Sequence, residues 1–157
     1  MAFFHLYFYI YSQIWGRTNS IVKRLQVLQN KALRIINFES FRSSATRCFK
    51  ESEILKVADH VSLQNILFAH DSINENLPSS LCGAMNMVGT IYNTRNEMYH
   101  QLNTPCTRTV TYGSKSIRSK SVEIWNLVNR SNPAEKLKEK SRAACKIFVK
   151  KFLLSQY

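Results

Sequence analysis

Residues 21–36 read IVKRLQVLQNKALRII, and this stretch decides the fold class. Apolar side chains recur in it every three or four residues, at Ile21, Leu25, Leu28, Ala32 and Ile35, with Val22, Leu33 and Ile36 beside them. This period is typical of an α-helix with one apolar stripe. Four cations lie largely off the stripe: Lys23, Arg24, Lys31 and Arg34. Residues 18–20, Thr-Asn-Ser, offer N-cap side chains, so the stretch predicts an amphipathic helix beginning near Ile21.

Helical patterns recur along the rest of the chain. We expect a short helix over residues 45–53, a longer one over 57–73, and another over 116–127. A last helix is expected from Pro133, which suits a first helical turn, to Leu154. Its apolar side consists of Leu137, Ala144, Phe148 and Phe152. The predicted fold is therefore mainly α, a small helical bundle of about five helices.

Residues 79–114 form the least regular stretch, because they hold three of the four Gly and many Ser, Thr and Asn. Tyr99–Leu102 and Arg108–Tyr112 have β-type composition, so we expect a short β-hairpin near residues 99–112. The expected organisation is one domain with three segments: a helical segment over residues 1–78, an irregular connection over residues 79–114 and a basic helical segment over residues 115–157.

Charge is the feature in which the composition departs most from the average. Twenty-two Lys and Arg stand against ten Asp and Glu, which gives a net charge of +12. Residues 79–157 hold thirteen of these cations and four of the acids. A balance of this kind favours a polyanionic partner, either nucleic acid or an anionic membrane surface. We expect an intracellular protein, nuclear or cytoplasmic, whose second half does most of the electrostatic work.

The N-terminal residues 2–15, AFFHLYFYIYSQIW, are almost continuously apolar. This run is shorter than the roughly 20 residues that a membrane-spanning helix needs. It also lacks the basic flank and the small-residue cleavage site of a signal peptide. A core segment is the favoured interpretation, and membrane association through this run is the alternative.

The sequence contains no recognisable catalytic, metal-binding or cofactor-binding motif. Cys48, Cys82, Cys106 and Cys145 are scattered without a close pair that could preorganise a zinc site, and we expect them to be reduced and mostly buried. His70 and Asp71 are neighbours on a predicted helix, where adjacent residues do not face each other. No glycine-rich phosphate loop is present. We expect no catalytic residue, no metal, no cofactor and no small-molecule substrate.

Several short strings, in order, resemble the C-terminal region of non-LTR (LINE, jockey-like) retrotransposon reverse transcriptases, downstream of the polymerase. They are Ile14-Trp15-Gly16, residues 25–32 (LQVLQNKA) with Arg34-Ile35-Ile36, Asn76-Leu77-Pro78, Tyr92-Asn93-Thr94-Arg95, Arg108-Thr109, residues 112–118 (YGSKSIR), Trp125-Asn126 and the closing residues 148–154. The sequence departs from the family pattern at residues 119–121, Ser-Lys-Ser, where an aromatic residue and a glycine are usual, and at Val128, where proline is usual. These departures are typical of drift in a decayed or captured copy.

The resemblance implies a fragment without polymerase activity. The family holds its metal ions with a pair of adjacent aspartates, whereas this chain has only Asp59 and Asp71, about 18 Å apart along one helix. It also implies a segment that lies beside template RNA or target DNA. The residues expected to contact nucleic acid are Arg95, Arg108, Tyr112, Lys115, Arg118, Lys120, Arg142, Lys146 and Lys150. A non-functional open reading frame whose product does not fold alone is a further interpretation.

Overall fold

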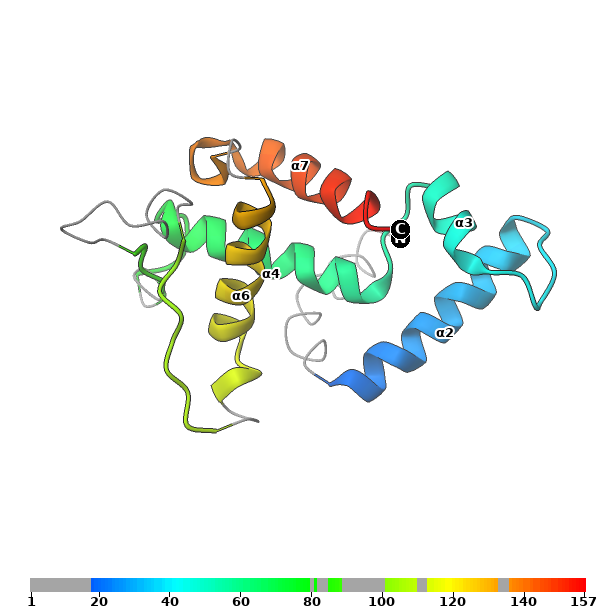
Figure 1. The fold of residues 1–157 in the computed structure, drawn as a ribbon, viewed down its shortest axis with the longest axis horizontal. Helices are drawn as coiled ribbons and strands as arrows, with labels where there is room; N and C mark the ends of the chain where they lie inside the picture. Colours follow the sequence, from blue (N-terminus) through cyan, green and yellow to red (C-terminus); the bar gives the residue numbers. More distant parts are fainter. Residues whose placement is uncertain (1–17, 80, 82–84, 89–100, 110–112, 133–135) are drawn as a thin grey trace. The chain divides into compact units, whose positions relative to one another are not determined.

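The computed structural model describes residues 18–79, 81, 85–88, 101–109, 113–132 and 136–157. Within these residues it contains five α-helices and one 3₁₀ turn (Figure 1). They are α2 (Asn19–Ile36), α3 (Ala45–Glu51), α4 (Val57–Ile73), α6 (Ile117–Ser131), η2 (Leu137–Glu139) and α7 (Arg142–Leu154). The predicted fold class, mainly helical and built as a small bundle, is confirmed.

The chain forms two compact units that do not follow chain order. Unit 1 comprises Met1–Leu63 together with Phe148–Tyr157, and unit 2 comprises Gln64–Ile147. Helices α4 and α7 therefore each contribute residues to both units. The expected organisation of the sequence into three segments of one domain stays a prediction.

Unit 1 has a small core where α2 meets α3. Leu33, Ala45, Cys48 and Phe49 are buried there, and Tyr157 packs against them. Local sequence explains both helix ends at this corner. Helix α3 begins after Ser44, whose hydroxyl accepts a hydrogen bond from the Thr46 amide. Helix α2 ends with Phe38 in the left-handed region (φ 53°), and the Glu39 amide donates to the Arg34 carbonyl, a C-terminal capping pattern that usually employs glycine.

Helix α2 packs against the other described residues of unit 1 through Leu33, Gln26 and Gln29, and not through its apolar stripe. Leu33 is 3% exposed, whereas the stripe residues Leu28 and Ile35 are 60% and 75% exposed. The inward face carries Gln26 and Gln29, whose side-chain oxygens both accept from the Val57 amide, at 2.9 and 3.1 Å. Two glutamines thus satisfy a backbone donor at the start of α4 that would otherwise have no intrahelical partner. The sequence predicted the helix correctly, but the apolar period did not identify the face that packs.

Unit 2 is built around α6 and the C-terminal half of α4. Ser116 caps α6 by accepting from the Ser119 amide. The buried apolar side chains of this unit are Ile66, Leu67, Ala69, Met85, Leu102, Val122, Trp125, Val128, Leu137 and Cys145. Asn126 fastens the 101–103 segment to α6, because its side-chain amide donates to the Leu102 carbonyl (2.9 Å) and accepts from the Leu102 amide (2.8 Å).

The structure corrects two of the sequence-based expectations in unit 2. Leu102 forms an antiparallel bridge with Met87, so its described partner is not the 108–112 segment expected for the hairpin. Several residues of that expected hairpin, 99–100 and 110–112, lie outside the described residues.

The second correction concerns the last helix, which was expected to run unbroken from Pro133. Residues 133–135 lie outside the described residues, and η2 is followed by an extended residue, Lys140 (ψ 149°), before α7 begins. Two contacts accompany the break. The Ser141 hydroxyl accepts from the Ala144 amide, and the Lys140 carbonyl lies 2.9 Å from Nε2 of His70, a residue 70 positions earlier. In α7 the buried positions are Cys145 and Val149, whereas Ala144 is exposed.

Candidate functional site

The first candidate is a group of cations at the N-terminal end of α6, here called the α6 cationic end and defined as Arg108, Lys115, Arg118 and Lys120. Backbone hydrogen bonds connect the residue after Arg108 to the segment before α6, because the Gly113 and Ser114 amides both donate to the Thr109 carbonyl, at 3.2 and 3.0 Å. Arg108, Lys115 and Arg118 are exposed. Lys120 is half-buried and pairs with Glu123 at 2.6 Å.

Gly113 allows the close approach that forms this end. A Cβ atom at this position would lie 2.6 Å from Thr107 Cβ, which is too short for two carbon atoms in contact. The Ser119 hydroxyl then donates to the Gly113 carbonyl at 3.0 Å and fixes the turn to the first turn of α6. This close approach explains why glycine, and no larger residue, occupies position 113 of the tyrosine-glycine-serine string at residues 112–114.

The electrostatics of the α6 cationic end favour an anion. Helix N-termini carry a partial positive charge, so acidic side chains are the stabilising choice in a first turn. The first turn of α6 has no acidic residue and instead carries Arg118. Exposed cations gathered at a positive helix end repel one another, and a bound polyanion would relieve that repulsion.

The other expected contact residues are placed differently. In α7, Arg142 donates from Nε to both carboxylate oxygens of Asp71, so it has a structural partner that the sequence did not indicate. One turn further along the helix, Lys146 is exposed, and Lys150 is half-buried. Arg95 and Tyr112 lie outside the described residues.

The described residues of the two units carry the same net charge. The described residues of each unit hold ten Lys and Arg and four Asp and Glu. The second half of the sequence holds more cations than the first, but the described cations are not concentrated in either folded unit. The C-terminal residues Lys150 and Lys151 contribute to this result, because they belong to unit 1.

The second candidate is a polar cluster around His70 in unit 2. The ring is 2% exposed, its Nε2 lies 3.1 Å from Asn74 Nδ2, and its Nδ1 lies 3.7 Å from Asp71 Oδ1. The expectation that His70 and Asp71 would not approach each other was wrong, because both side chains turn toward the same side of α4. Among the described residues, no group of three His, Cys, Asp or Glu side chains could hold a metal ion.

Cys145 lies in the buried interior of unit 2 but has the wrong chemistry for a nucleophile. Burial, with a smaller contribution from the Asp71 carboxylate, raises the pKa of its thiol to about 11. The thiolate is the reactive form of cysteine, and at neutral pH this thiol stays protonated. Cys48 is buried as well, whereas Cys106 is exposed, so two of the three described cysteines are buried. Cys82 lies outside the described residues.

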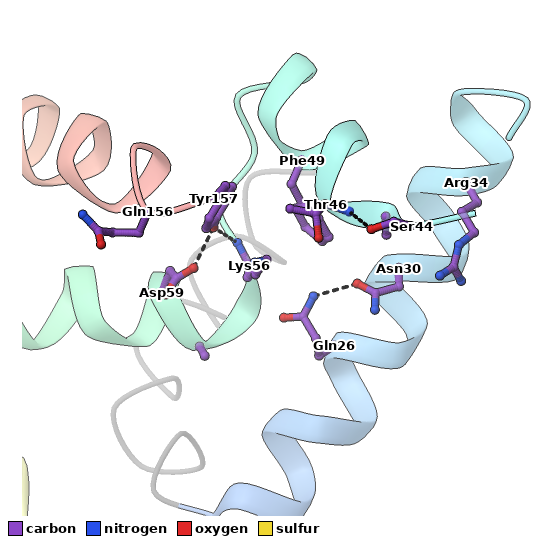
Figure 2. A pocket seen from close by; sticks show the side chains of 12 residues that line it. Gln26, Asn30, Arg34, Ser44, Thr46, Phe49, Lys56, Asp59, Gln156 and Tyr157 are labelled. Atoms are coloured by element: carbon purple, nitrogen blue, oxygen red, sulfur yellow. Dashed lines mark hydrogen bonds between the residues drawn. The ribbon is translucent and has the colours of Figure 1, made fainter. Parts of the chain in front are cut away.

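The third candidate is a cavity of about 540 Å³ in unit 1 (Figure 2). It is lined by Gln26, Asn30, Arg34, Ser44, Ala45, Thr46, Phe49, Lys56, Ala58, Asp59, Gln156 and Tyr157. Figure 2 shows Arg34 on one side and Tyr157, Asp59 and Lys56 on the opposite side. Sequence reasoning missed this cavity, because its walls come from four segments that are distant along the chain.

Comparison of the chain with protein-family models, with curated proteins and with solved structures gives no match. No helix among the described residues has both the length and the apolar character that crossing a bilayer requires. Support for a function therefore comes from the residues themselves.

Proposed function

We propose that this chain is a non-catalytic nucleic-acid-binding module, related to the C-terminal region of a non-LTR retrotransposon reverse transcriptase. It binds RNA or DNA without sequence specificity through phosphates at the α6 cationic end. The observation that supports this most directly is the set of three exposed cations, Arg108, Lys115 and Arg118, at a helix N-terminus without an acidic first turn.

The binding mode follows from the chemistry of these groups. Guanidinium and ammonium groups neutralise phosphates and release counterions, which makes affinity strongly dependent on salt. Such contacts carry no sequence information, because they do not reach base edges. The binding is therefore expected to tolerate any base sequence.

The proposed origin is supported by the order of the short strings and by the structural roles of some of their residues. Gly113 permits a close backbone approach, Trp125 is fully buried, and Asn126 holds the Leu102 backbone. Residues with such roles are the ones that a descendant retains when its activity is lost, since replacing them costs stability.

The test is a salt titration with a matched control. Fluorescence anisotropy would measure binding of a labelled RNA or DNA oligonucleotide between about 50 and about 300 mM salt. With about five phosphate contacts, the slope of log affinity against log salt should be near −4.5. The triple variant Arg108→Gln, Lys115→Gln, Arg118→Gln should reduce the magnitude of that slope by about 2.7.

The control removes the same charge from unit 1. Lys23→Gln, Arg24→Gln, Lys31→Gln changes three exposed cations of α2 and should leave the slope nearly unchanged. Equal effects of the two triple variants, or no measurable binding at low salt, would overturn the proposal.

A second candidate function is association with an anionic membrane surface. The observation that favours it is α2, which exposes Ile21, Leu28 and Ile35 along one stripe and carries four cations and no acid. Such a helix can lie in the interface of an anionic bilayer. Flotation with anionic vesicles distinguishes the two functions, because Leu28→Gln with Ile35→Gln would abolish flotation and leave oligonucleotide affinity unchanged.

A further inference from the structure

The unit 1 cavity carries polar groups of two different kinds at its two ends. We infer that it binds a phosphorylated, hydroxyl-bearing compound of nucleotide size, with the phosphate at Arg34 and the hydroxyl groups at Asp59. Its volume of about 540 Å³ lies within the range of roughly 300–1,000 Å³ that is usual for small-molecule sites. This site is separate from the α6 cationic end, which belongs to unit 2.

Arg34 is oriented by the protein and keeps its binding groups available. Its Nε donates to the Ser43 carbonyl at 2.9 Å, which holds the plane of the guanidinium. Among the described residues no carboxylate forms an ion pair with it, and its two terminal nitrogens have no hydrogen-bond partner. A guanidinium held in this way presents two parallel donors, the arrangement that matches two oxygens of one phosphate.

Neutral donors stand beside Arg34. The Oδ1 atom of Asn30 accepts from Gln26 Nε2 at 2.8 Å, which fixes the amide so that Nδ2 is a remaining donor. Thr46 adds a hydroxyl from α3, and Figure 2 shows both side chains between the two ends of the cavity. Three kinds of donor in one lining suit a phosphate better than a carboxylate, since a phosphate has more acceptor sites.

The opposite end is built around Tyr157. Its hydroxyl donates to Asp59 Oδ2 at 2.7 Å and accepts from the Lys56 amide at 2.8 Å. The ammonium group of Lys56 lies 4.1 Å from the centre of the Tyr157 ring. Burial raises the pKa of the tyrosine hydroxyl well above its ordinary value, so the hydroxyl remains a donor to Asp59 at neutral pH.

Because of Asp59, this end of the cavity favours ligand groups that donate hydrogen bonds. Asp59 lines the cavity, and only its Oδ2 accepts from Tyr157, which leaves Oδ1 as a further acceptor. The free carboxylate oxygen can accept hydrogen bonds from ribose-type hydroxyl groups. The cavity therefore offers polar groups for a compound with one phosphate end and one hydroxyl end.

Calorimetric titration of the full chain tests the inference with four probes. The probes are adenosine 5′-monophosphate, adenosine, an oligonucleotide with a 5′-phosphate and the same oligonucleotide with a 5′-hydroxyl. Saturable binding of the monophosphate and at least tenfold weaker binding of adenosine are expected. If the 5′-phosphate strengthens oligonucleotide binding and the monophosphate competes for it, the source is a strand end. If the monophosphate binds but the 5′-phosphate does not strengthen oligonucleotide binding, the natural ligand is a free nucleotide.

Variants locate the site. Arg34→Gln should weaken monophosphate binding at least tenfold, whereas Arg42→Gln removes an exposed cation outside the cavity lining and should change it less than twofold. Because Arg34→Gln also loses the bond to Ser43, Thr46→Val provides a second variant that should weaken binding without affecting the fold. The α6 triple variant should bind the monophosphate normally, which separates this inference from the proposed function. Equal binding of adenosine and its monophosphate, or equal loss in Arg34→Gln and Arg42→Gln, would overturn it.

Discussion

The guanidinium of Arg142 donates from Nε to both carboxylate oxygens of Asp71, at 3.1 and 2.9 Å. The two residues are 71 positions apart, on α7 and α4. The Asp71 side chain is only 12% exposed, so the pair is partly shielded from water. Arg142 is the first residue of α7, where a cation is unfavourable unless an acid lies nearby. A residue expected to contact nucleic acid thus has a clear role in the stability of unit 2.

Replacing Arg142 by glutamine is predicted to lower the free energy of unfolding by about 1–2 kcal/mol, because it leaves a largely buried carboxylate without its charged partner. Lys146→Gln is the control, since this exposed residue lies one turn away on the same helix and should change stability by less than about 0.5 kcal/mol. Urea denaturation followed by circular dichroism measures both. The same free energy for the two variants would show that the Asp71 contact contributes nothing.

Two asparagines on α6 should respond very differently to truncation. Asn126 makes two hydrogen bonds to the Leu102 backbone, whereas the side-chain nitrogen of buried Asn129 has no hydrogen-bond partner among the described residues. Asn126→Ala is predicted to destabilise the protein by about 2–4 kcal/mol, because it leaves two buried backbone groups unpaired. Asn129→Ala should cost less than about 1 kcal/mol, since no hydrogen bond of that nitrogen is lost. Thermal unfolding compares them, and a larger loss for Asn129→Ala contradicts the described contacts.

Leu33 and Leu28 test which face of α2 packs. Leu33→Ala removes a buried side chain from the core of unit 1 and is predicted to cost about 2–4 kcal/mol. Leu28→Ala shortens an exposed side chain of the apolar stripe and should cost less than about 0.5 kcal/mol. Helix propensity does not confuse the comparison, because both changes are from leucine to alanine in one helix. If Leu28→Ala proved the more damaging variant, the stripe would be the packed face.

Stability above pH 9 should depend on Cys145. The thiol has a pKa of about 11 in the folded protein, compared with an ordinary value of 9.0 in the unfolded chain. Because folding raises this pKa, the contribution of the neutral thiol is complete below pH 9. It is lost as the pH rises toward 11, by about 1.4 kcal/mol per pH unit.

The measurement compares the wild-type protein with Cys145→Ala in urea denaturation at several pH values and with a reductant present. The alanine variant lacks the titrating group, so the difference between the two free energies of unfolding should shrink between about pH 9 and pH 11. Other groups that titrate in this range, mainly lysines, affect both proteins equally. A difference that stays constant with pH would mean that the thiol is not shielded by burial.

The sequence by itself determined where the helices lie. The patterns over residues 21–36, 57–73 and 116–127 are local signals, and the structure has helices at all three places. It also determined the net charge of +12, which favours a polyanionic partner. These features depend only on neighbours within one or two turns, which is why one sequence sufficed to predict them.

Only the tertiary structure decided which face of each helix packs and which cations are already paired. The side of α2 that carries Gln26, Gln29 and Leu33 packs against other described residues, and Gln26 and Gln29 bond to Val57, about thirty residues away. Arg142 is held by an acid 71 residues distant. The cavity of unit 1 is lined in part by Tyr157, whose hydroxyl bonds to residues about a hundred positions earlier. A periodic pattern states that a helix has two faces, but the partner of each face is set by side chains that meet only when the chain is folded.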